Sequence, residues 1–191
     1  MMDERELIRR SQKGDGEAFG QLIERYKSKV FKLAYGMIGD RSEADDLAQE
    51  VFIKAYYALP KFQFRSEFGT WLYRIAVNQV RDYLRKNRHR LDELSIDELG
   101  ETIPGVSGSS FEERQLADKR RSLVQTALRR LPDKYRTILA LRDMQDLPYE
   151  EISRILAISP GTVDSRLHRA RKKLREKLAA IVGGKGGDYG L

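Results

Sequence analysis

Apolar residues recur every three or four positions along most of this chain, and one stretch of turn-forming residues interrupts the pattern. The spacing is typical of helices that bury one face, and no segment shows the alternation of a half-buried strand. The interruption, Ile103 to Ser110, is rich in proline, glycine and serine, which favour loops. The sequence therefore predicts an all-α protein with two small helical domains joined by a flexible linker.

The charge follows the same division. The net charge is +7, but residues 1–90 carry +5, residues 91–115 carry −6 and residues 116–191 carry +8. We expect a first domain at 1–90, an acidic linker at 91–115, a second domain at 116–180 and a disordered tail at 181–191. A single basic segment could equally be a helix face that is exposed to solvent. Two basic domains in one small chain favour a polyanionic partner, most simply nucleic acid.

The first domain has three long helical patterns. The first covers Phe19–Met37 and ends at Gly39. The second opens with Ser42 in a weak variant of the capping box, and its apolar stripe includes Tyr56. Thr70 can cap the third. These patterns predict a helical bundle.

The second domain has shorter helices with clear boundaries. Phe111–Leu131, Asp133–Met144 and Tyr149–Ala157 each have the helical spacing, and a fourth helix starts at Pro160 with Ser159 as its cap. The last two are joined by only a few residues. A short helix, a tight turn and a basic helix predict a helix-turn-helix whose second helix enters the major groove of DNA.

Composition excludes several kinds of site. There is no cysteine and there are only two histidines, so a disulfide framework or an ordinary metal centre is not expected. No phosphate-binding loop or activated nucleophile is present, and we expect no cofactor, no small-molecule substrate and no enzymatic activity. The sequence shows no apolar run long enough for a membrane span, and its N-terminus is too polar for a secretory signal. We therefore expect a cytoplasmic protein.

Five motifs follow one another along the chain: Asp45–Phe52, Thr70–Asn78, Leu131–Pro132, Tyr149–Ile152 and Gly161–Val163. In residues and in order they closely resemble the motifs of extracytoplasmic function (ECF) sigma factors of the sigma-70 family. The resemblance implies an initiation factor that binds core RNA polymerase, directs it to promoters by their −35 and −10 elements, and promotes melting. It implies as partners the polymerase clamp coiled coil and flap, promoter DNA as duplex and melted single strand, and an anti-sigma factor.

One helix face is the expected polymerase-binding surface. Its residues lie three or four positions apart, and the resemblance implies that they contact the clamp: Asp45, Asp46, Gln49, Glu50 and Ile53. Acidic residues near a helix start can instead complement the helix dipole. That alternative suits Asp45 and Asp46 better than Gln49 and Glu50, which lie beyond the first turn.

A second set of residues is expected to bind the −10 element. A protein that opens DNA without nucleotide hydrolysis must hold an extruded base on an aromatic face or in a pocket. The candidates are an aromatic loop and a polar helix stripe, namely Phe64, Arg65, Ser66, Phe68, Arg74, Asn78, Arg81 and Arg85. Alternatively, Phe62, Phe64 and Phe68 pack beneath the bundle, which we expect of at least one of them. Trp71 is expected to pack in the core.

The resemblance also implies which residues read the −35 element. The candidates are Arg142, on the phosphate backbone, and Thr162, Asp164, Ser165, Arg166, His168, Arg169, Lys172 and Lys173 on the last helix. Many relatives carry a basic residue where this chain has Asp164. An acid cannot contact phosphate favourably, but it can accept from a cytosine amino group or orient a neighbouring arginine, so the −35 sequence cannot be copied from relatives. His168 has no partner at metal-ligand spacing.

Two interpretations remain open both for the role of the linker and for the function of the whole chain. Two promoter elements about one and a half duplex turns apart lie roughly 50 to 60 Å from each other, so the linker must be partly stretched or threaded to let both domains bind. Its charge fits threading through basic polymerase channels, or a solvated spacer. The alternative function is a helix-turn-helix regulator that is not a polymerase subunit. That reading leaves the motifs at Asp45–Phe52 and Thr70–Asn78 unexplained.

Overall fold

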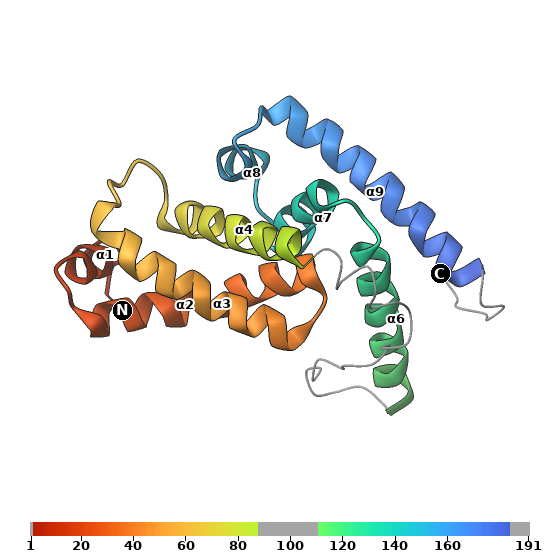
Figure 1. Ribbon diagram of the computed structural model, residues 1–191, viewed down its shortest axis with the longest axis horizontal. Helices are drawn as coiled ribbons and strands as arrows, with labels where there is room; N and C mark the ends of the chain where they lie inside the picture. The colour runs from red at the N-terminus through yellow and green to blue at the C-terminus, as the bar shows by residue number, and fades with distance from the viewer. Residues whose placement is uncertain (1, 88–110, 184–191) are drawn as a thin grey trace.

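The computed structural model describes residues 2–87 and 111–183, with side chains from residue 116 onward in the second range (Figure 1). The elements are α1 (Glu4–Gln12), α2 (Gly16–Ile38), α3 (Arg41–Ala58), the 3₁₀ turn η1 (Leu59–Lys61), α4 (Phe68–Lys86), α6 (Phe111–Arg129), α7 (Asp133–Leu139), the π-helical turn η2 (Ala140–Met144), α8 (Tyr149–Leu156) and α9 (Pro160–Gly183). Over these ranges the fold is all-α, as predicted. Residues 88–110, which include most of the predicted linker, and residues 184–191 of the predicted tail lie outside the described residues.

The first domain is built around α2, which packs against α1, α3 and α4. Because its apolar side chains are spaced three and four residues apart, Leu22, Val30 and Leu33 point into the same core, where each is fully buried. Val51 of α3 and Leu72 of α4 close that core from the other side. Each such side chain contributes about 1.5–3 kcal/mol by leaving water, so the apolar spacing holds this bundle together.

The helix ends in this domain agree only partly with the predictions. Gly39 ends α2 in the left-handed conformation (φ 78°), as expected. The cap of α3 is Asp40, not Ser42: its Oδ1 accepts a 2.9 Å hydrogen bond from the main-chain N–H three residues on. The prediction that Thr70 caps the third helix is also wrong, because α4 begins at Phe68 and the Thr70 hydroxyl is buried within it.

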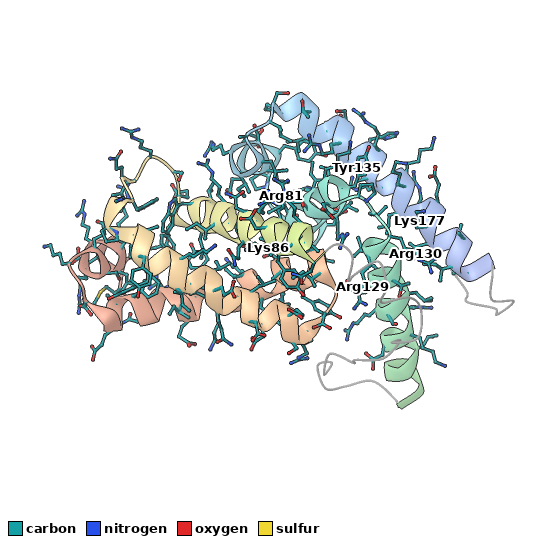
Figure 2. The ribbon with its side chains drawn as sticks, viewed as in Figure 1. Arg81, Lys86, Arg129, Arg130, Tyr135 and Lys177 are labelled. Carbon is teal, nitrogen blue, oxygen red and sulfur yellow. The ribbon has the colours of Figure 1, made fainter. Side chains whose placement is uncertain are left out.

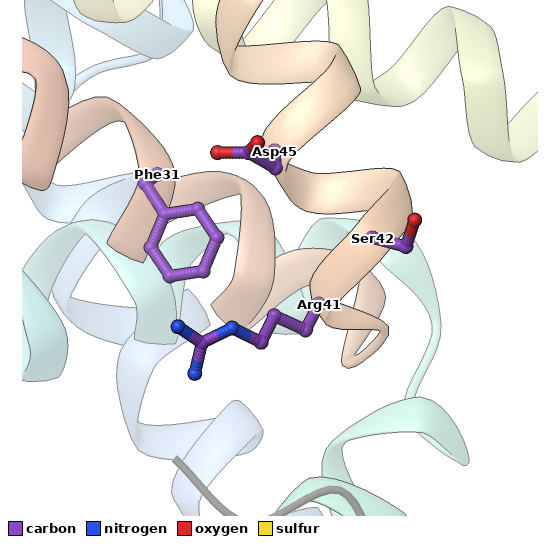
Figure 3. A pocket seen from close by; sticks show the side chains of 4 residues that line it. All are labelled: Phe31, Arg41, Ser42 and Asp45. Atoms are coloured by element: carbon purple, nitrogen blue, oxygen red, sulfur yellow. The ribbon is translucent and has the colours of Figure 1, made fainter. Parts of the chain in front are cut away.

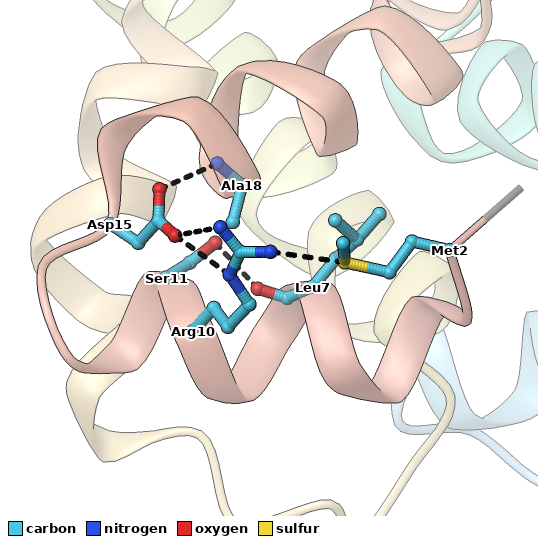
Figure 4. Close-up of polar contacts among 6 residues, drawn as sticks. All are labelled: Met2, Leu7, Arg10, Ser11, Asp15 and Ala18. Carbon is cyan, nitrogen blue, oxygen red and sulfur yellow. Dashed lines mark hydrogen bonds and ion pairs between the residues drawn. The ribbon is translucent and has the colours of Figure 1, made fainter.

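The turn between α1 and α2 is fixed by an ion pair (Figure 4). Asp15 caps α2 by accepting from the Ala18 N–H at 3.0 Å, and Arg10 Nη2 lies 2.6 Å from its other oxygen. The Ala18 N–H first, and then Arg10, hold the pKa of Asp15 below its usual range. The sequence pattern did not single out α1, because only two of its nine residues are large apolar ones.

The second domain consists of α6, α7 with η2, α8 and α9. Ser159 caps α9 as predicted, because its Oγ accepts from the Thr162 N–H at 3.2 Å. Ala157 ends α8 in the left-handed conformation (φ 52°), which produces the tight turn of the helix-turn-helix. Helix α6 begins at Phe111, as its apolar spacing predicted, and α9 continues to Gly183, past residue 180.

The two domains pack against each other. Helix α2 contacts α6, α7 and η2, and α4 contacts α8. Figure 1 shows α8 beside α4, whereas α6 extends away from the first domain. This packing brings the candidate −10 and −35 surfaces into one body.

Candidate protein-binding and nucleic-acid interfaces

The face of α3 that was predicted to bind polymerase is a true surface. Every one of its five predicted residues is exposed, namely Asp45, Asp46, Gln49, Glu50 and Ile53. Gln49 Nε2 donates to Asp45 Oδ2 at 3.3 Å, one helical turn away. Glu50 also accepts from Gln79 of α4. The α3 face is therefore available to a partner, and a hydrogen bond joins Glu50 to the neighbouring helix α4.

An apolar patch that the sequence analysis missed continues this face. Ile53, Tyr56 and Tyr57 are 57%, 41% and 77% exposed. Tyr56 was expected on the buried stripe; instead its ring lies across the surface, edge-on to Phe19 at 5.1 Å between centroids. The signal was present as a second three-and-four spacing, Ile53 to Tyr57, beside the buried one. The face of α3 thus changes from acidic to apolar along its length.

A surface cleft of about 440 Å³ adjoins the acidic end of this face. Its walls are Phe31 of α2 and three residues from the start of α3, Arg41, Ser42 and Asp45 (Figure 3). The cleft combines an aromatic ring, a cation and a carboxylate. It therefore adds shape and charge to the α3 surface.

The loop before α4 divides its phenylalanines between core and surface. Phe62 and Phe68 are 7% and 2% exposed, so the expectation that at least one packs in the bundle is confirmed. Phe68 has no surface to offer DNA, and its predicted contact with the −10 element is wrong. Phe64 is half-buried and has a positive φ of 57°, a conformation that costs energy in a bulky residue. The guanidinium groups of Arg5 and Arg9 each lie 6.0 Å from its ring centre.

Contacts from two helices hold this loop in place. Gln12 Nε2 donates to the main-chain oxygens of Leu59 and Phe62, at 3.1 and 2.8 Å. Trp71 packs on Phe62 with 5.1 Å between ring centroids, in agreement with its predicted core role. With the loop so anchored, Arg65 stays exposed and Ser66 half-buried at its tip.

The polar stripe of α4 is only partly open to solvent. Arg74, Asn78 and Arg85 are exposed, whereas Arg81 is half-buried where α4 faces the second domain (Figure 2). Burial lowers the pKa of the Arg81 guanidinium, and Arg166 on α9 lowers it further. The stripe keeps its predicted residues together, but the second domain covers part of it.

The outer side of α9 carries most of the predicted −35 residues. Asp164, His168, Arg169, Lys172 and Lys173 are exposed, and Thr162, Ser165 and Arg166 are half-buried. Arg169 folds along the helix, where its Nε donates to the Ser165 main-chain oxygen at 3.1 Å. The helix therefore presents a row of polar and basic side chains.

Arg142 lies apart from that row, within η2. Its Nη1 donates to the Leu147 oxygen at 2.9 Å and lies 3.4 Å from Asp146. Its guanidinium also lies 5.6 Å from the ring centre of Tyr149. Arg142 thus fixes the turn that leads into α8.

A small basic hollow of about 110 Å³ lies where α7 meets α9. Lys134, Tyr135, Thr162, Arg166 and Arg169 line it. Lys134 was not among the predicted DNA-binding residues, although a basic residue two positions after Pro132 at a helix start was the available signal. Three cations, Lys134 on α7 with Arg166 and Arg169 on α9, suit a phosphate group.

Two negative findings apply to the described ranges. Within residues 2–87 and 111–183, no helix combines the length and hydropathy that a membrane span requires. In the same part of the chain, no three His, Asp or Glu side chains meet as metal ligands would.

The comparisons with known proteins agree with this geometry. The family Sigma-70 region 2 matches residues 22–90, and Sigma-70, region 4 matches residues 121–174. The ECF RNA polymerase sigma factor SigW of Bacillus subtilis is 38% identical over 176 residues, which are 90% of this chain and 94% of SigW.

Two solved structures share the arrangement of helices. CnrH, in complex with the cytosolic domain of CnrY, superposes with a TM-score of 0.69 at 26% identity, over 93% of this chain and 99% of CnrH. The sigma factor RpoE of Bartonella quintana, in complex with the anti-sigma factor NepR, shows the same fold with a TM-score of 0.66 at 24% identity, over 84% of this chain and 96% of RpoE. Given the extent and identity of the match to SigW, this chain belongs to the ECF RNA polymerase sigma factors.

Proposed function

We propose that this chain binds core RNA polymerase, directs it to promoters by their −35 and −10 elements, and promotes melting of the DNA. One observation carries the proposal: a single chain has an exposed acidic and apolar face on α3 and, on separate helices, two basic surfaces. A protein that only bound DNA would need no third surface of that kind. A factor that joins a polymerase to a promoter needs all three.

The three surfaces have separate tasks in this proposal. The α3 face (Asp45, Asp46, Gln49, Glu50 and Ile53, with Tyr56 and Tyr57) contacts the clamp coiled coil, and the second domain contacts the flap. The −10 surface holds melted single strand through Phe64, Arg65, Ser66, Arg74, Asn78, Arg81 and Arg85. The −35 surface reads duplex through Arg142, Thr162, Asp164, Ser165, Arg166, His168, Arg169, Lys172 and Lys173, with Lys134 added as a phosphate contact.

The chain supplies specificity and no catalysis of its own in this account, and it acts in the cytoplasm, where the polymerase and the DNA are. Its regulation involves an anti-sigma factor. Support for that partner is the likeness to CnrH, which was solved with the cytosolic domain of CnrY bound. The acidic linker at 91–115 threads a basic polymerase channel.

A transcription assay tests the proposal. Purified chain and core polymerase are mixed with templates that carry a candidate promoter or a scrambled −35 element. We expect specific transcripts only with chain, core and intact promoter together. DNA binding by the chain alone, with no promoter-specific transcript, would instead support the helix-turn-helix regulator.

A further inference from the structure

Two arginines of α1 lie beside the aromatic ring of the loop before α4. The guanidinium groups of Arg5 and Arg9 each lie 6.0 Å from the ring centre of Phe64, and both arginines are exposed. The sequence motifs did not include α1, and the match to Sigma-70 region 2 begins at residue 22, beyond that helix. The structure therefore adds two basic side chains to a surface that was assigned only to the loop and to α4.

Contacts at both ends hold α1 in place. Near its start, the Tyr26 hydroxyl of α2 donates to Glu4 Oε2 at 2.9 Å. At its end, Gln12 Nε2 donates to the main-chain oxygens of Leu59 and Phe62 in the segment that leads into the loop. The two arginines are therefore presented to the loop from a fixed helix, and fixed elements suit a binding site better than loops do.

The two arginines have no carboxylate partner in the described part of the chain. Within residues 2–87 and 111–183, no Asp or Glu oxygen lies within 4.0 Å of either guanidinium, whereas Arg10 on the same helix lies 2.6 Å from Asp15. Arg5 and Arg9 are one helical turn apart, and like charges at that spacing repel each other. An anion beside them would relieve the repulsion, and phosphate suits the geometry of guanidinium groups.

The Phe64 ring offers a place for a base next to these cations. The side chain is half-buried and packs on Phe62, with 5.1 Å between ring centroids. Its φ of 57° is unusual for a bulky residue, and strained backbone of this kind is concentrated at sites that hold a ligand. Proteins that bind single strands combine aromatic rings, on which bases stack, with cations along the phosphates. Phe64 with Arg5 and Arg9 supplies both components.

The order of the elements gives the direction of the strand. The polar stripe of α4 runs from Arg85 near the C-terminal end of the helix to Arg74 nearer its start, and the chain continues from that C-terminal end to the second domain. Because the second domain binds the upstream −35 element in the proposed function, this end of α4 faces upstream. Figure 1 shows α1 at the far end of the first domain from the second domain. A strand that follows the stripe and passes Phe64 therefore reaches α1 on its downstream side.

We propose that Arg5 and Arg9 bind phosphate groups of the melted strand immediately downstream of the base held at Phe64. The contact is made to the phosphate backbone, so it strengthens the hold on melted DNA whatever the sequence there. Because it depends on a base that has left the duplex, it stabilises melted DNA relative to duplex DNA. This inference deepens the proposed function and rests on it.

A series of fork templates tests the contact in the complete holoenzyme. Each template is duplex through the −35 element, and its non-template strand continues as a single-stranded tail. The tails end at successive nucleotides, from the start of the −10 element to several nucleotides beyond it. Holoenzyme assembled from core polymerase and the parent chain is titrated onto each template, and we expect affinity to increase at the tail length that first brings a downstream phosphate to α1.

The variant Arg5→Gln with Arg9→Gln should lose this increase and bind shorter tails as the parent chain does. The loss on long tails should be about tenfold at low salt, with a salt slope that is smaller by about 1.4, because two phosphate contacts to a single strand contribute that much. Arg5→Lys with Arg9→Lys keeps both charges without the planar guanidinium and should keep most of the increase.

A matched control removes the same charge elsewhere. Lys119→Gln with Arg130→Gln changes two exposed positions on α6, and this variant should show the same increase as the parent chain. If the control also lost the increase, the effect would be one of net charge and the proposal would be wrong.

Three further results would overturn the proposal. They are an unchanged increase in the glutamine variant, an equal loss of affinity at every tail length, which would mean that the arginines only support the fold of the loop, and an equal loss in the lysine variant. A template with scrambled −10 and −35 elements tests the proposed function separately. Equal affinity of the parent holoenzyme for scrambled and intact templates would refute the proposed function, and the comparison of tail lengths would still decide the phosphate contact.

Discussion

Arg136 Nη1 donates a 2.7 Å hydrogen bond to the main-chain oxygen of Met37 and so joins the second domain to the end of α2. We expect Arg136→Met to leave both domains folded but to weaken their coupling by about 1–3 kcal/mol, because methionine fills similar space and cannot donate. Calorimetry should resolve two unfolding transitions in the variant where the parent chain gives one. An unchanged single transition would show that the bond does not couple the domains.

The α3 face can be tested separately from stability. We expect Gln49→Ala with Glu50→Ala to weaken core polymerase binding at least tenfold, about 1.4 kcal/mol, and to change thermal stability little, because both side chains are exposed. The affinity is measured by fluorescence anisotropy of labelled chain titrated with core. Gln79→Ala is the control, because it removes the partner of Glu50 without altering the face. Equal core affinity in the double variant would place the polymerase contact elsewhere.

Two substitutions on α9 should affect DNA binding in different ways. Arg169→Ala should cost about 1–3 kcal/mol at the cognate −35 site and relax preference at one base position, because arginine makes directional contacts to base edges. Lys172→Ala should weaken binding to all sequences alike and reduce the salt slope by about 1, as loss of a phosphate contact does. Binding of polymerase holoenzyme to a panel of −35 variants at several salt concentrations measures both. Unchanged selectivity with Arg169→Ala would mean that α9 docks differently.

Alkaline pH should weaken the hydrogen bond that the Tyr73 hydroxyl of α4 donates to Gln145, the residue after η2. Burial, with a smaller contribution from Glu151, raises the pKa of Tyr73 to about 12. An unfolded tyrosine loses its proton near pH 10, so the unfolded state binds fewer protons and stability falls as pH rises from about 10 to about 12. We expect this fall to be shallower in Tyr73→Phe, measured by urea unfolding at several pH values. Tyr57→Phe is the control because Tyr57 is 77% exposed; equal slopes in Tyr73→Phe and the parent chain would contradict the assignment.

The sequence was sufficient for the helices that have long apolar stripes. The spacing in Phe19–Met37 predicted α2 to within a few residues, and Ser159 before Pro160 placed the start of α9. Helix α1 was not predicted, because it contributes few apolar side chains and is held by contacts with residues far away in the sequence, such as that of Gln12 with Phe62. Local pattern carries no information about such contacts.

The candidate surfaces were predicted in the same uneven way. Helical spacing correctly predicted an exposed face made of Asp45, Asp46, Gln49, Glu50 and Ile53. It could not show that Tyr56 turns outward or that Phe68 turns inward. Those outcomes depend on which aromatic rings the bundle has room to enclose. The packing of the two domains was also beyond sequence reasoning, because it depends on distant contacts such as that of Gly36 on α2 with Met144 of η2.

Permanganate footprinting of a complete complex tests the central claim most directly. Chain, core polymerase and promoter DNA are combined, and protection of the −35 duplex is read together with the reactivity of unpaired thymines near −10. The account predicts that both signals appear together, and only when chain and core are both present. Protection of DNA by the chain alone, with no reactive thymines when core is added, would contradict it.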